Sequence, residues 1–185
     1  MVMNMTATHS RAAARTSVLA LLALLASASL VPAQGNRAPD LPPGCEALQV
    51  PAGNVVSVHA YAEGFQTYWW DATRGAWLFT GPVAVLYADA GHNAVIGVHS
   101  SGPTWVSNSG SGIVGRVLAG NLVEPTAIPW LLIQTVSTRG PGPFAPTTFV
   151  QRVNTAGGLA PSRPGTANEV VWVPYTAEYY FYRAL

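Results

Sequence analysis

Apolar and polar side chains alternate along most of the chain after residue 55. Val56, Val58 and Ala60 are separated by single polar or amphipathic residues, and this period of two predicts a β-strand with one face toward a core. The alternation predicts further strands at residues 65–70, 76–80, 83–88, 95–99, 104–107, 113–118, 149–154, 170–173 and 178–182. Short strands at close spacing indicate hairpins. We therefore expect an all-β fold, an antiparallel and meander-rich sandwich or barrel of about 9–10 strands.

Glycine-containing turns separate the predicted strands. Residues 70–75 and 108–112 are typical of hairpin loops, because each combines Gly with Asp, Asn or Ser. In residues 124–137 a short buried helix and a central strand fit equally well. Pro125 suits a first helical turn, whereas Pro129 opposes a long helix. We expect at most one short helical turn near residues 124–130, followed by a strand.

A proline-rich segment precedes the first strand. Pro39, Pro42, Pro43 and Gly44 exclude a helix there, so we expect an extended lead-in over residues 34–50. This segment contains Cys45, the single cysteine of the chain. One cysteine cannot form an internal disulfide, so burial or pairing with another molecule is a better expectation for Cys45 than nucleophilic chemistry.

The N-terminal residues have the layout of a secretory signal peptide. Arg11 and Arg15 precede an uncharged run, rich in Leu and Ala, over residues 18–31. That run is shorter than the roughly 20 residues of a permanent membrane-spanning helix. We expect residues 1–33 to be removed by cleavage after Ala33, leaving a secreted or periplasmic protein with no membrane span. Residues 51–185 are then long enough for a single all-β domain.

Charge narrows the range of partners. The chain has a formal net charge of +1 and no lysine. Loss of Arg11 and Arg15 with the signal peptide would bring the net charge to about −1, so nucleic acid is not an expected partner. Without lysine, Schiff-base chemistry is excluded and arginine fills every cationic role.

Most catalytic and cofactor motifs are absent from the sequence. There is no G-x-S-x-G elbow, no H-E-x-x-H, and no second cysteine for a thiolate metal site, so no metal or cofactor is expected. Gly110, Gly112 and Gly115 do form a G-x-G-x-x-G. However, residues 116–120 predict a short strand and a turn rather than a helix that would face a pyrophosphate. We interpret the three glycines as part of a hairpin.

A few imidazoles and carboxylates remain as candidate catalytic groups. His59, His99 and Glu178 are the weak candidates, because residues on different strands of a β-domain can meet regardless of their spacing. Ordinary structural roles near the core are the favoured interpretation of each histidine.

Arg152 is a candidate for ligand binding. It lies between two Gly- and Pro-rich loops in a chain that uses arginine sparingly. A structural ion pair with Glu178 or Glu169 is the favoured interpretation. The alternative is a corner, formed with Asn154 and Tyr175, that binds an anion or a sugar.

Aromatic residues are abundant, with six Trp and seven Tyr. Trp69 and Trp70 must face opposite sides of one strand, so some large rings lie outside a single core. Either these rings form a ligand surface, for which Trp70 and Trp105 are candidates, or loops cover them.

Two classes of function follow from these residues. The first, which we favour, is a non-catalytic exported or envelope-associated module that binds a glycan or another small ligand. The second is a small secreted enzyme in which His59 or His99, a carboxylate and Arg152 meet in one cleft. The sequence leaves the oligomeric state open.

Four phrases carry a resemblance over nearly the whole expected mature chain. They are Gly102-Pro103-Thr104-Trp105, Ala127-Ile128-Pro129-Trp130-Leu131-Leu132, Val150-Gln151-Arg152-Val153-Asn154-Thr155 with Gly157-Gly158, and Val173-Pro174-Tyr175-Thr176-Ala177-Glu178-Tyr179-Tyr180. The chain thereby resembles an uncharacterised family of exported bacterial and fungal proteins that is known as a domain of unknown function. Some fungal relatives are labelled malate dehydrogenase. A chain without βαβ units has no place for a dinucleotide, so that label is not expected to apply here.

Overall fold

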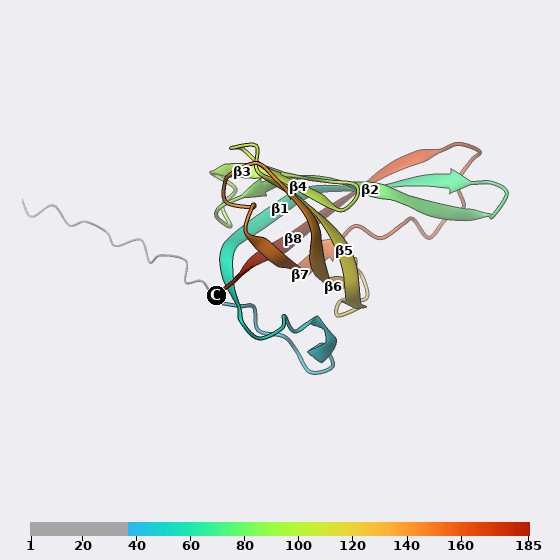
Figure 1. The fold of residues 1–185 in the computed structure, drawn as a ribbon. Coiled ribbons are helices and arrows are strands. Elements are labelled where there is room, and N and C mark those ends of the chain that lie inside the picture. Colours follow the sequence, from blue (N-terminus) through green and yellow to red (C-terminus); the bar gives the residue numbers. More distant parts are fainter. Residues whose placement is uncertain (1–36) are drawn as a thin grey trace, which may run out of the picture. The chain divides into compact units, whose positions relative to one another are not determined.

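The computed structural model of the protein describes residues 37–185. The predicted signal peptide lies outside the described residues. Eight antiparallel strands follow one another around a closed barrel, and β1 pairs with β8 to close it (Figure 1). The strands are β1 (Asn54–Asp71), β2 (Ala76–Tyr87), β3 (Val95–Ser100), β4 (Thr104–Ser107), β5 (Gly112–Asn121), β6 (Trp130–Arg139), β7 (Thr147–Gly157) and β8 (Val170–Ala184). The all-β, meander-rich fold class is confirmed.

The barrel has fewer strands than the sequence predicted because some predicted breaks are absent. Residues 65–70 continue the first predicted strand within β1, and β2 and β8 likewise each join two predicted strands. Gly64 lies inside β1, where β2 approaches so closely that a Cβ would stand 2.1 Å from the carbonyl oxygen of Val83. Gly81, with a φ of 142°, lies beside the bulge in the β1–β2 pairing. Gly64 allows β1 and β2 to approach closely, and Gly81 accommodates a β-bulge, so neither glycine forms a turn.

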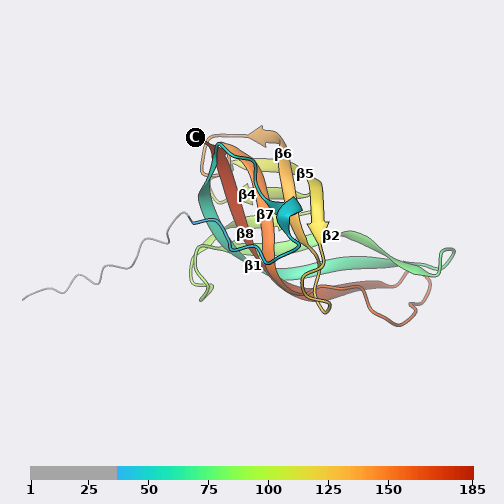
Figure 2. The same ribbon diagram turned by 90° about the horizontal axis from the view of Figure 1, so that it is seen from below.

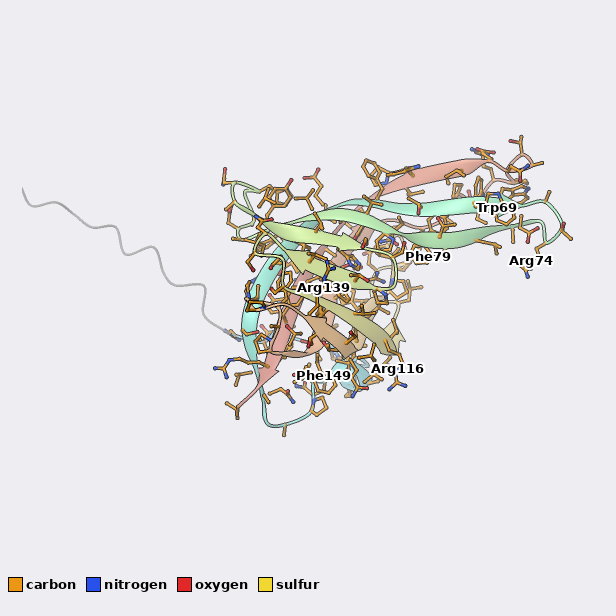
Figure 3. All side chains as sticks on the ribbon, turned by 45° about the horizontal axis from the view of Figure 1, so that its top comes forward. Trp69, Arg74, Phe79, Arg116, Arg139 and Phe149 are labelled. Atoms are coloured by element: carbon orange, nitrogen blue, oxygen red, sulfur yellow. The ribbon has the colours of Figure 1, made fainter. Side chains whose placement is uncertain are left out.

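Three strands extend beyond the barrel. β2 pairs with β3 only from Val83 to Tyr87, and β7 reaches β8 only as far as Tyr175. Beyond these points β1, β2 and the first part of β8 form a three-stranded ribbon, on the right in Figure 1. In Figure 3, Trp69 and Arg74 lie toward the far end of this ribbon and Phe79 lies nearer the barrel.

Side-chain alternation separates the inside of the barrel from its outside. On β8, Tyr179 and Phe181 belong to the interior core, whereas Tyr180 and Tyr182 belong to a second cluster on the outer face. The buried interior residues are Ala60, Ala62, Ala84, Leu86, Trp105, Ile113, Ile128, Ile133, Phe144, Val150, Tyr175, Ala177, Tyr179 and Phe181. The two faces of one strand therefore serve different clusters.

The lead-in segment covers the outer cluster. Cys45, Leu48 and Val50 are buried against outward side chains of β6, β7 and β8, and Figure 2 shows the segment crossing this side of the barrel. The amide of Gln151 donates to the carbonyl oxygen of Leu48 at 2.7 Å. Cys45 is buried as a free thiol. The prediction that this segment contains no helix was wrong over one turn, because residues Glu46–Leu48 form a 3-10 helix (η1).

The G-x-G-x-x-G stretch is a hairpin, as the sequence predicted. Gly110 has a φ of 86° and its N–H donates to the carbonyl oxygen of Ser107 in the turn between β4 and β5. At Gly115 a Cβ would lie 2.3 Å from Ile133 and 3.2 Å from the indole ring of Trp105. The glycines therefore serve a tight turn and close packing inside the barrel.

The segment before β6 is a turn followed by a strand, as predicted, but the turn at residues 124–127 is not helical. The N–H of Ala127 donates to the carbonyl oxygen of Glu124 at 3.0 Å, which closes a single turn. The strand β6 then begins at Trp130. Pro129 is the last residue before β6, and its carbonyl oxygen accepts hydrogen bonds from the side chain of Arg152 on β7.

Candidate ligand-binding site

A cavity of about 230 Å³ lies where the projecting ribbon meets the barrel. Its rim contains the exposed side chains of Phe79 on β2 and Val117 on β5. Its walls are largely apolar and come from the β2 bulge, the β3–β4 turn, β5 and β6. The further wall residues are Thr80, Gly81, Pro82, Ser101, Gly102, Pro103, Leu131 and Ile133. The side chains at the rim are exposed to solvent, whereas those at the floor of the cavity are all buried.

Four polar or aromatic side chains form the floor of the cavity. They are His99, Trp105, Arg152 and Tyr179. Each comes from a different strand, β3, β4, β7 and β8, and occupies an inward position. A mostly apolar cavity with a few convergent polar groups is the usual form of a small-molecule site.

Arg152 is the only charged residue at this floor. It shares its strand face with Val150, and register places it beside Leu131 and Tyr179. Its Nε and Nη2 atoms donate to the carbonyl oxygen of Pro129 at 3.1 and 2.7 Å. These bonds fix the orientation of the guanidinium group without neutralising its charge.

The prediction that Arg152 forms an ion pair with Glu178 or Glu169 was wrong. Glu178 instead accepts hydrogen bonds from His59, Asn154 and Tyr180, and Glu169 pairs with Arg163. All eight acidic residues of the sequence lie within the described part of the chain, and none of them is buried. Within residues 37–185 no carboxylate forms a salt bridge with Arg152, so a positive charge is buried without a counter-charge from this chain.

His99 is a neutral acceptor at the floor. Its Nδ1 is 2.9 Å from the carbonyl oxygen of Thr104, and a carbonyl can only accept, so Nδ1 carries the proton. Burial lowers the pKa of His99 to about 3, and the positive charge of Arg152 contributes in the same direction. Nε2 is therefore unprotonated at neutral pH.

Trp105 completes the floor beside His99. The two rings stack with centroids 4.5 Å apart and an interplanar angle of 8°. Trp105 is fully buried, and its indole Nε1 has no hydrogen-bond partner among the described residues. An unpaired buried donor at a cavity is a feature that a ligand can satisfy.

Buried tyrosines surround the same arginine. Burial raises the pKa of Tyr175 and Tyr179, while the charge of Arg152 opposes that rise at both. Their hydroxyl oxygens are 3.5 Å apart. The phenols stay protonated at neutral pH, so Arg152 carries the single net charge of this region.

A second polar cluster lies on the outer face of β1 and β8. His59 Nε2 is 2.7 Å from Glu178 Oε2, and the ring of His59 stacks on Tyr180 with centroids 4.0 Å apart. Asn154 donates to Glu178 Oε1 at 2.9 Å. Hydrogen bonding, first from His59, lowers the pKa of Glu178 although burial opposes it. Both carboxylate oxygens are occupied, which suits an anchoring role.

The structure thus divides the sequence-predicted candidates between two sides of the barrel wall. Arg152, Trp105, Tyr175 and His99 are inside, whereas His59, Glu178 and Asn154 are outside. Trp70 is in neither group. It packs edge-on against Trp77 in the projecting ribbon, with Gly165 against its ring.

Other features were not predicted from the sequence. Tyr179, the carbonyl oxygen of Pro129 and the rim residues Phe79 and Val117 were not singled out. Alternation with Val150 and Phe181 marks Arg152 and Tyr179 as inward residues, but a cavity rim depends on tertiary packing. The exposed rings of Trp172 and Phe65, 5.8 Å apart, lie on the projecting ribbon. Among residues 37–185 no group of three metal-ligating side chains comes together.

Fold and cavity together define a closed eight-stranded meander barrel with an internal, largely apolar cavity. The chain belongs to the family described as "Protein of unknown function (DUF3455)", whose family model matches residues 51–183. The malate dehydrogenase label is not supported. No curated protein matches the chain. No solved structure matches it either. In the described part of the chain, no helix has the length and apolar character needed to cross a membrane.

Proposed function

We propose that this protein is an exported, non-catalytic binding protein that holds a small, largely apolar molecule inside its barrel. The cavity of about 230 Å³ carries this proposal. It opens between exposed rim side chains and ends at buried polar groups, so an apolar body and a polar end can be bound together. An apolar wall suits such a ligand better than a glycan, which would present hydroxyl groups to it.

Export is the other half of the proposal. It is supported by the signal-peptide layout of Arg11 and Arg15 followed by the apolar residues 18–31. Expression of the full chain in a bacterial host, followed by N-terminal sequencing of the exported protein, tests it. We expect the sequence to begin at Gln34. Retention of Met1 in an unexported product would contradict export.

An enzymatic role of the second class needs a histidine, a carboxylate and Arg152 in one cleft. The described structure places the His59–Glu178 pair outside the barrel and Arg152 inside it. His99 shares the cavity with Arg152, but no carboxylate lies there. We therefore favour binding without chemistry.

Isothermal titration calorimetry with benzyl alcohol tests the binding site. Val117→Trp places a large ring at the rim, and Val136→Trp is the matched control. Both valines are exposed, by 47% and 55%, on the neighbouring strands β5 and β6, but only Val117 lines the cavity. We expect Val117→Trp to weaken binding about tenfold or more and Val136→Trp to leave it unchanged. Absence of saturable binding, or equal binding by both variants, would overturn the proposed site.

A further inference from the structure

We propose that the cavity selects a compact monocarboxylate, whose carboxylate group pairs with Arg152. This inference rests on the proposed function, because it names the class of molecule that the barrel binds.

The unpaired charge of Arg152 is the first argument. An isolated charge is costly to bury, so buried arginines normally pair with carboxylates. Arg152 is 9% exposed, and its guanidinium group donates two hydrogen bonds to one carbonyl oxygen and interacts with the neutral hydroxyl of Tyr179. A ligand carboxylate supplies the missing negative charge.

The free edge of the guanidinium group is the second argument. The carbonyl oxygen of Pro129 occupies the side-on edge formed by Nε and Nη2. The end-on edge, formed by Nη1 and the second N–H of Nη2, has no carboxylate partner among residues 37–185. The side chain that interacts with the guanidinium group is the neutral phenol of Tyr179. Two parallel N–H groups match the two oxygens of a carboxylate. Because Pro129 already fixes the group, little further ordering is needed when a ligand binds.

The charge of the cavity limits the ligand to one negative charge. Arg152 is the only charged side chain lining the cavity, since His99 is neutral. A phosphate carries about −1.5 to −2 charges at neutral pH and would bury charge that this site cannot neutralise. A monocarboxylate leaves the filled cavity close to neutral.

The volume of the cavity limits the size of the ligand. A cavity of about 150 Å³ accommodates benzene. By proportion, 230 Å³ suits a body and acid group of about nine non-hydrogen atoms together, which is the size of benzoate. The apolar side chains of Val117, Leu131 and Ile133 line the space that the ring would occupy.

The test compares benzoate with benzyl alcohol, which has nearly the same shape and no charge. Calorimetric titrations at neutral pH are made with the wild-type protein, Arg152→Gln and Arg116→Gln. The last is the matched control, because Arg116 is exposed on β5 beside Val117 and bonds Gln134 rather than lining the cavity. Figure 3 labels Arg116 on this strand.

We expect wild type and Arg116→Gln to prefer benzoate by about tenfold or more, and Arg152→Gln to lose that preference while still binding benzyl alcohol. Equal binding of the two probes by wild type would overturn the monocarboxylate and leave the binding site standing. Binding of neither probe would overturn both proposals. An equal loss of preference in both variants would show general surface charge and would also overturn the inference.

A second variant keeps the test decisive if Arg152→Gln does not fold. Arg152→Lys retains the charge but lacks the two-pronged edge. We expect it to keep part of the preference for benzoate. Full retention of the preference would contradict pairing through the end-on edge.

Discussion

The guanidinium group of Arg152 is held by the carbonyl oxygen of Pro129, through Nε at 3.1 Å and Nη2 at 2.7 Å. Arg152 lies on β7, and Pro129 lies immediately before β6. These two strands pair, with Leu131 opposite Arg152. A carbonyl group orients the arginine but leaves its charge unbalanced. The contact therefore orients a positively charged group at the floor of the cavity and does not form a structural ion pair.

The stability of an Arg152→Met variant distinguishes these two roles. Loss of the bonds to Pro129 costs about 1.5–3 kcal/mol, and removal of an unpaired buried charge offsets this by a similar or larger amount. We expect the free energy of unfolding, from urea denaturation without ligand, to fall by less than about 2 kcal/mol. A loss of about 3–5 kcal/mol is typical of a broken buried ion pair and would contradict the absence of a counter-charge.

Neutral His99 makes stability depend on pH. Its pKa is about 3 in the folded protein, against an ordinary value of 6.5, so the unfolded chain binds more protons between these values. The stabilisation is fully present above pH 6.5 and decreases as the pH falls toward 3. We expect a slope of up to about 1.4 kcal/mol per pH unit from this residue.

His99→Asn isolates that contribution. The Asn amide can replace the Nδ1 donor to the carbonyl oxygen of Thr104 but does not titrate. Urea denaturation at several pH values should show a smaller slope for the variant than for wild type between about pH 6 and 4. Identical slopes would contradict a neutral, buried His99.

Glu178 and Glu63 provide a matched comparison of two histidine–carboxylate pairs. Glu178 binds His59 with 22% of its side chain exposed, and Glu63 binds His92 with 59% exposed. Glu178→Gln leaves donors from His59, Asn154 and Tyr180 competing for one acceptor. We expect it to lower the free energy of unfolding by about 1–3 kcal/mol, and Glu63→Gln to change it by less than about 1 kcal/mol.

The pH dependence of the Glu178 contribution has a defined sign. Its folded pKa is lowered below the ordinary value of 4.5, so its stabilisation is present above that value and is lost as the pH falls through the folded pKa. The difference between wild type and Glu178→Gln should therefore shrink once the pH falls below 4.5. A difference that grows with acid would contradict the prediction.

Two glycines of β5 test the packing of the barrel interior. A Cβ at Gly115 would meet Ile133 at 2.3 Å. A Cβ at Gly120 would meet the flexible end of Leu131 at 3.0 Å and the carbonyl oxygen of Trp130 at 3.6 Å, which is an ordinary contact. We expect Gly115→Ala to lower the midpoint of urea denaturation, with a cost of about 1–3 kcal/mol, and Gly120→Ala to cost clearly less. Equal effects would contradict close packing at Gly115.

The fold class could be predicted from the sequence because alternation is a local property. Val58 and Ala60 show it directly, and Gly110 marks a real turn. Val56 was expected on the same face, but a bulge in the β1–β8 pairing between Val56 and Val58 places Val56 in the outer cluster. The number of strands was less predictable, since Gly64 and Gly81 look like turn residues but serve a close contact and a bulge. The role of such a glycine is set by the neighbouring strand, which local sequence does not identify.

The site could be predicted in part. Arg152 and Tyr175 were identified as candidate binding residues, but the partners of Arg152 were not, because strand pairing decides that Glu178 faces outward and Arg152 inward. His99 and His59 are similar in local sequence, yet one is inside the barrel and the other outside. The cavity depends on the closure of the whole sheet, so its rim at Phe79 and Val117 could not be deduced from any one segment.

A crystal structure of the protein with 4-bromobenzoate tests the central claim most directly, because the anomalous signal of bromine locates the ligand independently. We predict bromine density inside the barrel toward Val117, with the carboxylate oxygens within hydrogen-bonding distance of Nη1 and Nη2 of Arg152. An empty cavity at saturating ligand, or bromine only on the outer surface, would contradict the account.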